Sequence, residues 1–403
     1  MKIRTVEPIV LAAPEGEASS PWSSTVLLTR VTTTDGRVGW GEAPTTLMTL
    51  PVRESVREVA RVYEGSDVHD LGASFERFCR YSFYHSRSIE ATAALSSVDI
   101  ACFDLLGQEL GAPVHRLLGG PLHKRLRAYS NGWYSDCIEP DEFASKAGEM
   151  VRQGFRALKF DPFHDQYDTL SASGLADASA RVRAVREAVG PLVDLFIEYH
   201  GRFLPEAATR AGLELDQFRP SFMEEPVHPE LSDALADFRS RVRTPVALGE
   251  RLTTPADFES FLRRGLVDII QPDITNSGGF TSGRKIAAVA EAFGAPIAYH
   301  NAFGPVQTAA TLQLDATLPN FLVQESFEAS WPAWKRSLVS GYSIEEGGFG
   351  VPDRPGLGIK VRDGALEEFQ SSSMEPTGPE PPWVVAGTWV RRGSAVSARK
   401  RSR

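Results

Sequence analysis

The sequence predicts an α/β fold, a TIM-type barrel that follows a smaller α+β domain. Residues 1–123 begin with β-rich segments and then turn helical, which is typical of an α+β domain. From Leu126 onward, short β-like segments alternate with helix-compatible stretches, as in a barrel of parallel strands. An open doubly wound sheet is the competing topology, but no G-x-G-x-x-G turn follows an early strand.

The first domain is expected to span residues 1–123. Its β-rich run "STVLLTRVTTTDGRVGWGEA" is interrupted by Asp35-Gly36, a strong hairpin signal. In "ALSSVDIACFDLLGQELG", apolar residues recur at steps of three to five residues, which predicts a helix that ends at Gly111. We therefore expect strands followed by helices in this domain.

The barrel is expected over residues 124–353. Stretches such as "DEFASKAGEMVRQG" separate most of its β-like segments, which are "LRAYSN", "RALKFD", "DLFIEYH", "SFMEEP", "PVALGE", "DIIQPD", "APIAYH" and "FLVQES". Strands that alternate with helices pair in parallel. Eight such units in roughly the 250 residues typical of the fold predict a closed barrel.

The C-terminal part differs in composition. "PGLGIKVRDGALEEF" predicts a short last element, and we expect residues 354–370 to pack back toward the first domain. Residues 371–403 are first rich in Ser, Pro and Gly and then basic, which predicts a flexible, solvated tail. Trp383 and Trp389 in this tail are candidates for a local docking contact, for example between subunits.

The composition is that of a soluble globular protein, with 42% hydrophobic and 24% charged residues. The formal charge of −9 predicts no general attraction to nucleic acid or anionic membranes, and no apolar run approaches the roughly 18 residues of a membrane span. Cys79, Cys102 and Cys137 lack CxxC spacing, which suits a reducing cytoplasm. A metal site would therefore rely on oxygen ligands, which favours a hard cation such as Mg²⁺.

Ionisable residues follow the predicted strands. Seven of the eight segments end in one, and together these are Lys159, Asp161, Glu198, His200, Glu224, Glu250, Asp273, His300 and Glu325. The C-terminal ends of barrel strands carry the catalytic groups of this fold. Since each buried charge needs a partner, a purely structural barrel has no reason to collect so many charges at one rim.

Three of these acids are evenly spaced. Glu198, Glu224 and Glu250 lie 26 residues apart, so one βα unit separates each from the next and all three are expected on neighbouring strands. Converging carboxylates repel one another unless a cation lies among them, and Mg²⁺ prefers such oxygen ligands. A strand-end salt bridge explains any single acid, but the set of three predicts a metal site.

Two histidines flank the predicted metal. His300 and Asp273 end consecutive strands, so the aspartate can accept a hydrogen bond from the imidazole and fix its tautomer. His200 lies two residues after Glu198, and alternation along a strand would turn both side chains to the same side. The remaining histidines considered are expected to be structural: His69, His85, His115 and His123.

Several motifs together resemble the enolase superfamily, and within it the mandelate racemase group. These are "ALSSVDIACFDLLGQELGAPVHRLLGG", "FMEEPV", "LGERL", "IIQPDITNSGG" and "YHNAFGP", and the resemblance covers residues 1–368. It implies a modified (β/α)₇β barrel under an N-terminal capping domain. It also implies one Mg²⁺ per subunit on the three acids (with Mn²⁺ able to substitute), a homo-oligomer, and removal of a proton α to a carboxylate.

Within that group, "EYHGRF" resembles acid-sugar dehydratases of the galactonate and gluconate type. In those enzymes a histidine on the third strand follows a metal-binding aspartate by two residues, and here Glu198 replaces the aspartate. Mandelate racemase relatives carry a K-x-K pair after the second strand, whose second lysine is a base. This chain has Lys159-Phe160-Asp161 instead, which disfavours racemisation.

The resemblance leads to a specific hypothesis, dehydration of an aldonate or aldarate to a 2-keto-3-deoxy acid. His300, oriented by Asp273, would remove the C2 proton, and His200 would protonate the departing C3 hydroxyl. Lys159 and Glu325 would bind the substrate carboxylate, with Glu325 either protonated or bridged by water. Substrate contacts are further expected from Trp22, Asp161, Asn131 and Trp133.

Three other functions stay open at this point. A cycloisomerase acting on a sugar-acid lactone or anhydro sugar acid would use the same base and metal. A non-catalytic barrel that serves as a binding protein is a more distant alternative. A zinc hydrolase would need more histidine ligands than this rim offers.

Overall fold

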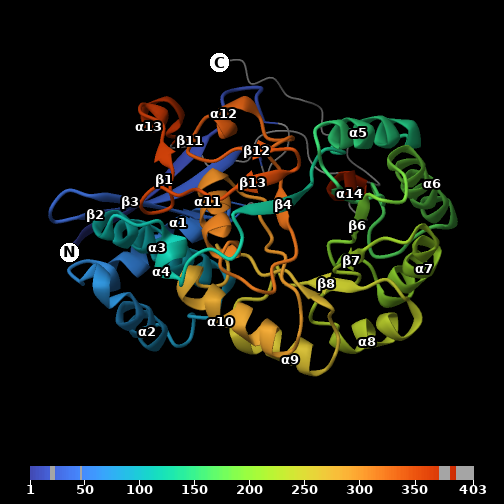
Figure 1. Ribbon diagram of the computed structural model, residues 1–403. Helices are drawn as coiled ribbons and strands as arrows, with labels where there is room; N and C mark the ends of the chain where they lie inside the picture. The colour runs from blue at the N-terminus through green and yellow to red at the C-terminus, as the bar shows by residue number, and fades with distance from the viewer. Residues whose placement is uncertain (19–22, 46–47, 372–381, 387–403) are drawn as a thin grey trace, which may run out of the picture.

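The computed structural model describes residues 1–18, 23–45, 48–371 and 382–386, and shows a barrel with a smaller domain packed against it (Figure 1). The small domain begins with an antiparallel sheet in the order β1-β2-β3, formed by β1 (Ile3–Ala12), β2 (Thr25–Thr33) and β3 (Val38–Ala43). Gly36, with a φ of 87°, turns the chain between β2 and β3, so the predicted hairpin is confirmed.

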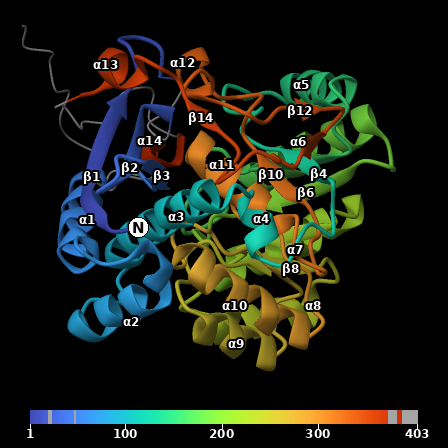
Figure 2. The same ribbon diagram turned by 60° about the vertical axis from the view of Figure 1, so that its left-hand side comes forward.

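α1 (Thr49–Tyr63) and α3 (Ile89–Leu110) pack against this sheet. The other helical elements of the small domain are the 3₁₀ turn η2 (Val68–Asp70), α2 (Leu71–Tyr81) and α4 (Val114–Leu117). Ser88 caps the start of α3 through Ala91 N, and Gly111 ends the helix with a left-handed φ of 63°, as the sequence predicted. α3 lies between the small sheet and the barrel (Figure 2), which explains why most of its side chains are buried.

Seven labelled strands form the parallel barrel. They are β4 (Arg125–Ser130), β5 (Ala157–Phe160), β6 (Asp194–Glu198), β7 (Phe222–Glu224), β8 (Val246–Leu248), β9 (Ile269–Ile270) and β10 (Gln324–Ser326). Ile297 takes the place of a strand between β9 and β10, because it bridges both Ile270 and Phe321 in parallel. β10 pairs with β4 and closes the barrel.

A helix follows each of the first seven barrel positions. These are α5 (Pro140–Arg152), α6 (Ala172–Val189), α7 (Pro205–Leu215) with the 3₁₀ turn η3 (Asp216–Phe218), α8 (Ser232–Arg241), α9 (Pro255–Arg263), α10 (Gly279–Ala292) and α11 (Pro305–Asp315). β10 is followed directly by the four-residue helix α12 (Ala333–Arg336) in place of a full barrel helix. This is the (β/α)₇β arrangement that the resemblance implied. No helix in the described part of the chain is long and apolar enough to cross a membrane.

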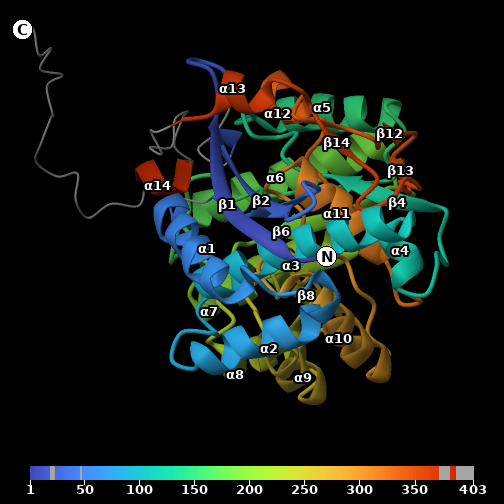
Figure 3. The ribbon, with the colours of Figure 1, turned by 90° about the vertical axis from the view of Figure 1, so that its left-hand side faces the viewer.

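The chain then returns to the small domain. Two short strand pairs follow the barrel: β11 (Val339–Ser340) with β14 (Lys360–Val361), and β12 (Ile344–Glu345) with β13 (Gly348–Gly350), which also pairs with β4. α13 (Ala365–Phe369) lies near the end of β1 (Figure 3), where Ser371 N donates to Val10 O. A last helix, α14 (Pro382–Ala386), is separate from α13.

The barrel interior is layered. One buried apolar residue from every strand position forms a cluster: Tyr129, Ala157, Phe196, Phe222, Ala247, Ile269, Ala298 and Val323. Strand side chains alternate with a period of two, so the residue two positions later faces the interior one layer higher. At several positions that residue is polar, as in Lys159, Glu198, Glu224, Gln271, His300 and Glu325. The apolar layer is thus the floor of a polar site.

Buried carboxylates join the small domain to the barrel. Glu42 from β3 accepts hydrogen bonds from the backbone of Val306 and Gln307 at the start of α11, each at 3.0 Å. Asp99 from α3 accepts from Thr281 N and Oγ1 at the start of α10. Burial raises the pKa of both carboxyls to about 7 even though the hydrogen bonds oppose it. Both contacts place a carboxyl group at a helix N-terminus, where the partial positive charge of the helix dipole stabilises its ionised form.

Candidate active site

An ammonium group lies among three buried carboxylates at the top of the barrel. Lys159 Nζ is 2.8 Å from Glu224 Oε2, 2.9 Å from Glu325 Oε1 and 3.2 Å from Glu198 Oε2. The four side chains come from β5, β6, β7 and β10, and each is at most 3% exposed. The structure therefore brings these predicted residues together into one cluster.

The cluster is short of positive charge. Burial, followed by the charge of Glu198, raises the pKa of Glu224 well above its usual value. Burial alone would raise the pKa of Glu325 as well, but Lys159 and His300 outweigh it and lower that pKa to about 2. The two carboxyls are thus pushed in opposite directions, because Glu325 has Lys159 and His300 as cationic neighbours whereas Glu224 has Glu198 as an anionic one.

Glu198, Glu224 and Glu250 are a donor set that suits a hard divalent cation. Glu224 Oε1 is buried and has no hydrogen-bond partner, so this oxygen is available to a cation. Among the described residues, no group of three His, Cys, Asp or Glu side chains is already arranged around a metal position. Lys159 lies between two of the acids, and Glu250 turns toward His300 instead. The donors fit Mg²⁺ chemically, and Glu198, Glu224 and Glu250 are the residues that would hold it.

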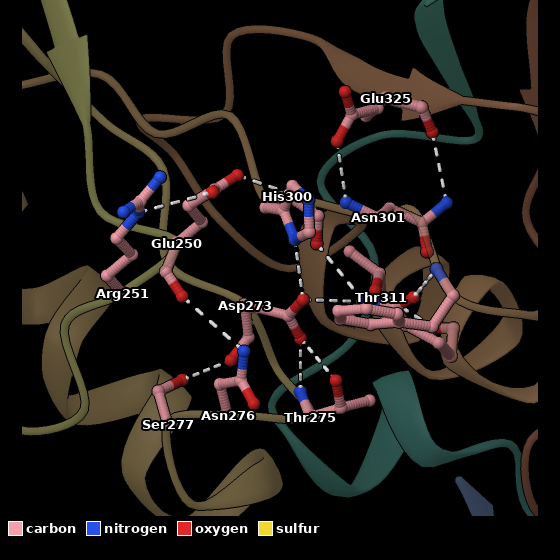
Figure 4. Close-up of polar contacts among 12 residues, drawn as sticks. Glu250, Arg251, Asp273, Thr275, Asn276, Ser277, His300, Asn301, Thr311 and Glu325 are labelled. Atoms are coloured by element: carbon pink, nitrogen blue, oxygen red, sulfur yellow. Dashed lines mark hydrogen bonds and ion pairs between the residues drawn. The ribbon is translucent and has the colours of Figure 1, made fainter. Parts of the chain in front are cut away.

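His300 and Asp273 form the predicted pair (Figure 4). His300 Nδ1 is 2.6 Å from Asp273 Oδ2, which leaves Nε2 directed at Glu250 Oε2, 3.3 Å away. Burial alone would lower the pKa of His300, but Glu250 and the hydrogen bond to Asp273 raise it to about 10. Thr275 N and Oγ1 donate to the other oxygen of Asp273, at 2.6 and 2.5 Å, and hold the carboxylate in place.

Gln307 links this pair to the small domain. Its Nε2 donates to Asp273 Oδ2 at 2.9 Å, and its Oε1 accepts from Phe303 N at 2.7 Å. Its backbone N–H is one of the two held by Glu42. Gly304 lets the two domains approach this closely, because a Cβ there would lie 2.2 Å from Glu42 Oε1. The sequence reasoning missed Gln307 and Glu42, although the position of Gln307 in the first turn after "YHNAFGP" was a usable signal.

His200 reaches the site in a way that strand alternation did not predict. β6 ends at Glu198, and His200 lies in a turn with a left-handed φ of 54°. The alternation argument for its orientation was therefore wrong. Its backbone N–H donates to Glu198 Oε1 at 2.7 Å, and its ring Nδ1 lies 3.1 Å from Asp161 Oδ2. The turn brings the imidazole to Asp161 rather than leaving it free at the rim.

Asp161 has a different place from the one expected. Its carboxylate is 1% exposed and pairs with the guanidinium of Arg202 through contacts of 2.5 and 3.0 Å. Burial would raise its pKa, but Arg202 and the hydrogen bond from His200 outweigh it and hold the pKa well below the usual range. This burial argues against the predicted substrate contact, and the geometry makes Asp161 a support for His200. Arg202 was missed by the sequence reasoning.

The other residues expected to contact the substrate have different places in the structure. Asn131 Nδ2 donates to Glu325 Oε1 at 2.9 Å, so Asn131 belongs to the site. Trp133 is 5% exposed and packs among aromatic rings, with Phe160 at 5.5 Å and Phe143 at 6.2 Å between centroids. That packing argues against a substrate contact of Trp133. Trp22 and Trp389 lie outside the described residues, as do segments 372–381 and 387–403 of the predicted 371–403 tail; residues 382–386 of that tail form helix α14, which differs from the flexible, solvated segment expected there.

Arg251 joins the two halves of the site. Its guanidinium lies 2.9 Å from Glu225 Oε2 and 3.7 Å from Glu250 Oε1, and it donates to His200 O at 2.5 Å. Since Glu250 also contacts His300, the chain of contacts runs from one histidine to the other. Gln271 adds a further neutral donor, to Glu224 Oε2 at 2.6 Å.

Known families match both parts of the chain. Residues 3–119 match the mandelate racemase / muconate lactonizing enzyme N-terminal domain, and residues 142–365 match the enolase C-terminal domain-like family. The chain belongs to the mandelate racemase group of the enolase superfamily. A solved mandelate racemase/muconate lactonizing enzyme-like protein from a Roseovarius species superposes on this enolase-superfamily chain with a TM-score of 0.86 and 32% identity, covering 94% of this chain and 98% of that one.

Two relatives carry more specific names. A D-gluconate/D-galactonate dehydratase of Picrophilus torridus is 51% identical over 388 residues, which is 96% of this chain and 99% of the relative. A D-gluconate dehydratase of Thermoproteus tenax is 45% identical, over 96% of this chain and 78% of the relative. This member of the superfamily is therefore similar to sugar-acid dehydratases along nearly its whole length.

Proposed function

We propose that this protein is a Mg²⁺-dependent sugar-acid dehydratase that converts an aldonate to a 2-keto-3-deoxy acid. The observation that carries the proposal is the presence of two separate His–Asp pairs at one barrel rim, His300 with Asp273 and His200 with Asp161. Dehydration needs a base for one proton and an acid for the leaving hydroxyl, and two pairs supply both. The similarity to the two dehydratases supports the same reaction.

The carboxylate of the substrate would bind above the Lys159 cluster. Glu198, Glu224 and Glu250 would hold Mg²⁺, which when bound acts as a Lewis acid toward the charge that develops on the substrate carboxylate. Lys159 adds a fixed positive charge at the same place, and the low-dielectric surroundings strengthen its effect. Asn131 and Asn301 hold Glu325 on the far side of the cluster, so that its charge stays paired with Lys159.

His300 would remove the C2 proton. Asp273 keeps the neutral imidazole protonated at Nδ1, so the lone pair of Nε2 is free to accept the proton. The same carboxylate stabilises the imidazolium that forms. Nε2 now faces Glu250 at 3.3 Å, and with Glu250 serving as a metal ligand it would face the substrate C2 proton instead.

His200 would then give a proton to the C3 hydroxyl as the C3–O bond breaks. The electron pair of the former C2–H bond forms the C2–C3 double bond, and water leaves with the proton from His200. The resulting enol becomes the 2-keto-3-deoxy acid by taking a proton at C3 and releasing the proton of its C2 hydroxyl. Asp161 and Arg202 hold the His200 ring in place throughout.

A substrate panel tests the proposal. Aldonates and aldarates, including D-gluconate and D-galactonate, are incubated with the protein and Mg²⁺, and 2-keto acids are detected as semicarbazones. We expect turnover of at least one aldonate that stops with a chelator and returns with Mg²⁺, and none with His300→Asn. A product that keeps the mass of its substrate would instead indicate a cycloisomerase. No turnover of any panel member with Mg²⁺ present would contradict the proposal.

A further inference from the structure

We propose that α14, near the C-terminus, supplies a wall of the active site, and that Trp383 in this helix positions His200 for the acid step of the proposed function. The rings of Trp383 and His200 lie 5.3 Å apart between centroids, with 31° between their planes. The guanidinium carbon of Arg202 lies 4.8 Å from the centre of the same indole ring. One side chain of α14 therefore contacts both His200 and the arginine that anchors Asp161.

α14 orients its side chains so that Trp383, and not its neighbour, reaches the active site. α14 is a separate helix from α13 (Figure 1), and its Trp383 lies against His200 and Arg202, which follow β6 in the chain. Trp383 is partly buried there, whereas its neighbour Val384 is 48% exposed. α14 thus turns the indole toward the site and presents Val384 to solvent.

The indole packs against the face of the His200 ring, whereas Asp161 and Arg202 both meet the ring at its Nδ1 edge. The hydrogen bond from Nδ1 to Asp161 fixes one edge of the ring, but the His200 side chain is still 33% exposed and lies in a turn rather than a strand. An aromatic face packed against the imidazole limits its rotation about that hydrogen bond. The indole of Trp383 also covers Arg202 and so shields the ion pair between Arg202 and Asp161 from water. This ion pair is stronger in such low-dielectric surroundings.

Loss of Trp383 should affect the two chemical steps, removal of the C2 proton and protonation of the C3 hydroxyl, to different extents. Trp383 contacts His200, and the pair formed by His300 and Asp273 is held by other residues. Loss of the indole should therefore impair proton donation at C3 and leave removal of the C2 proton intact. A structural role of Trp383 in folding or in metal binding would reduce both steps together.

The experiment compares Trp383→Ala, Trp383→Phe and the matched control Val384→Ala in the full chain. Exchange of the C2 proton in D₂O and formation of the 2-keto acid are followed on the same sample with Mg²⁺. For Trp383→Ala we expect exchange within twofold of wild type and dehydration reduced roughly ten- to a hundredfold, the scale of a misplaced catalytic group. Trp383→Phe should recover most of the loss, and Val384→Ala should match wild type. Normal dehydration by Trp383→Ala, or equal losses in both steps, would overturn the inference.

A second measurement does not depend on turnover. The carbon-bound ring protons of His200, assigned with His200→Asn, feel the ring current of a nearby indole. Their resonances should move in Trp383→Ala and stay in place in Val384→Ala; no difference between these variants would overturn the contact itself. A wild-type protein that shows neither exchange nor dehydration would count against the proposed function, and the resonances would still decide whether Trp383 lies on His200.

Discussion

Replacing Asp273 by asparagine removes one charge and one acceptor from the site at almost constant shape. In the structure this carboxylate accepts hydrogen bonds from Thr275 N and Oγ1 on one oxygen, and from His300 Nδ1 and Gln307 Nε2 on the other. An asparagine side chain offers one acceptor oxygen and one NH₂ group. Its NH₂ group, itself a donor, must therefore face other donors, either those of Thr275 or those of His300 and Gln307.

Both orientations of the amide are costly. With NH₂ toward Thr275, the buried backbone N–H of Thr275 loses its acceptor, at a cost of about 1–3 kcal/mol. With NH₂ toward His300, Nδ1 must become an acceptor, so the proton moves to Nε2 and the base is lost. An aspartate-to-asparagine change in another His–Asp pair lowers kcat by about 10⁴-fold, and we expect roughly 10³- to 10⁴-fold here, or about 4–5.5 kcal/mol.

The assay is exchange of the C2 proton of D-gluconate in D₂O with Mg²⁺, followed by proton NMR beside formation of the 2-keto acid. Asp273→Asn should lose both. Thr275→Val is the matched control, because it removes one donor to Asp273 and keeps the carboxylate; its loss should stay below about tenfold. Exchange by Asp273→Asn within tenfold of wild type would refute the role assigned to the pair.

Four further predictions follow from the same geometry. His200→Asn should keep part of the C2 exchange and lose dehydration, and normal dehydration would contradict its role as the acid. Glu224→Gln should weaken Mg²⁺ binding by at least about 100-fold in calorimetric titration, since even outer-shell changes cost 10- to 100-fold; an unchanged affinity would exclude Glu224 as a ligand. Gln307→Leu should lower kcat with little change in KM, because it loosens Asp273 without reaching the cluster around Lys159, and an altered KM alone would count against that role. Against the effect of burial, Glu250 and Asp273 raise the pKa of His300 to about 10, so its protonated form contributes stability that is complete below pH 6.5 and is lost as the pH rises through about 10. If Glu250 ligates Mg²⁺ as proposed, its charge would stabilise the imidazolium less, so calorimetry at pH 8 in buffers of different ionisation enthalpy should detect proton release on Mg²⁺ binding, which His300→Asn should reduce; no proton release would count against Glu250 as a ligand.

The residues that the sequence could place are those that follow the strand period. Lys159, Glu198 and Glu224 lie two positions beyond an apolar residue of the barrel floor, so alternation directs them into one polar layer. His300 and Asp273 were predictable for a related reason, because they end adjacent strand positions. In regular strands, the spacing of residues along the sequence is enough to predict which side chains point into the same layer of the barrel.

The residues that the sequence could not place depend on turns or on distant contacts. His200 adopts a left-handed φ, which an Asn, Asp or His tolerates but which no period reveals. Glu42 meets Gln307 across 265 residues of sequence, and only the packing of two domains brings them together. The same holds for Trp383, which contacts His200 although 183 residues separate the two in the sequence.

The most direct test of the central claim is proton NMR of D-gluconate and D-galactonate with the wild-type protein and Mg²⁺ in D₂O. At least one of them should yield a 2-keto-3-deoxy acid whose C3 methylene carries deuterium from the solvent, and a chelator should abolish the reaction. Both sugar acids remaining intact, with their C2 protons unexchanged in the presence of Mg²⁺, would contradict it.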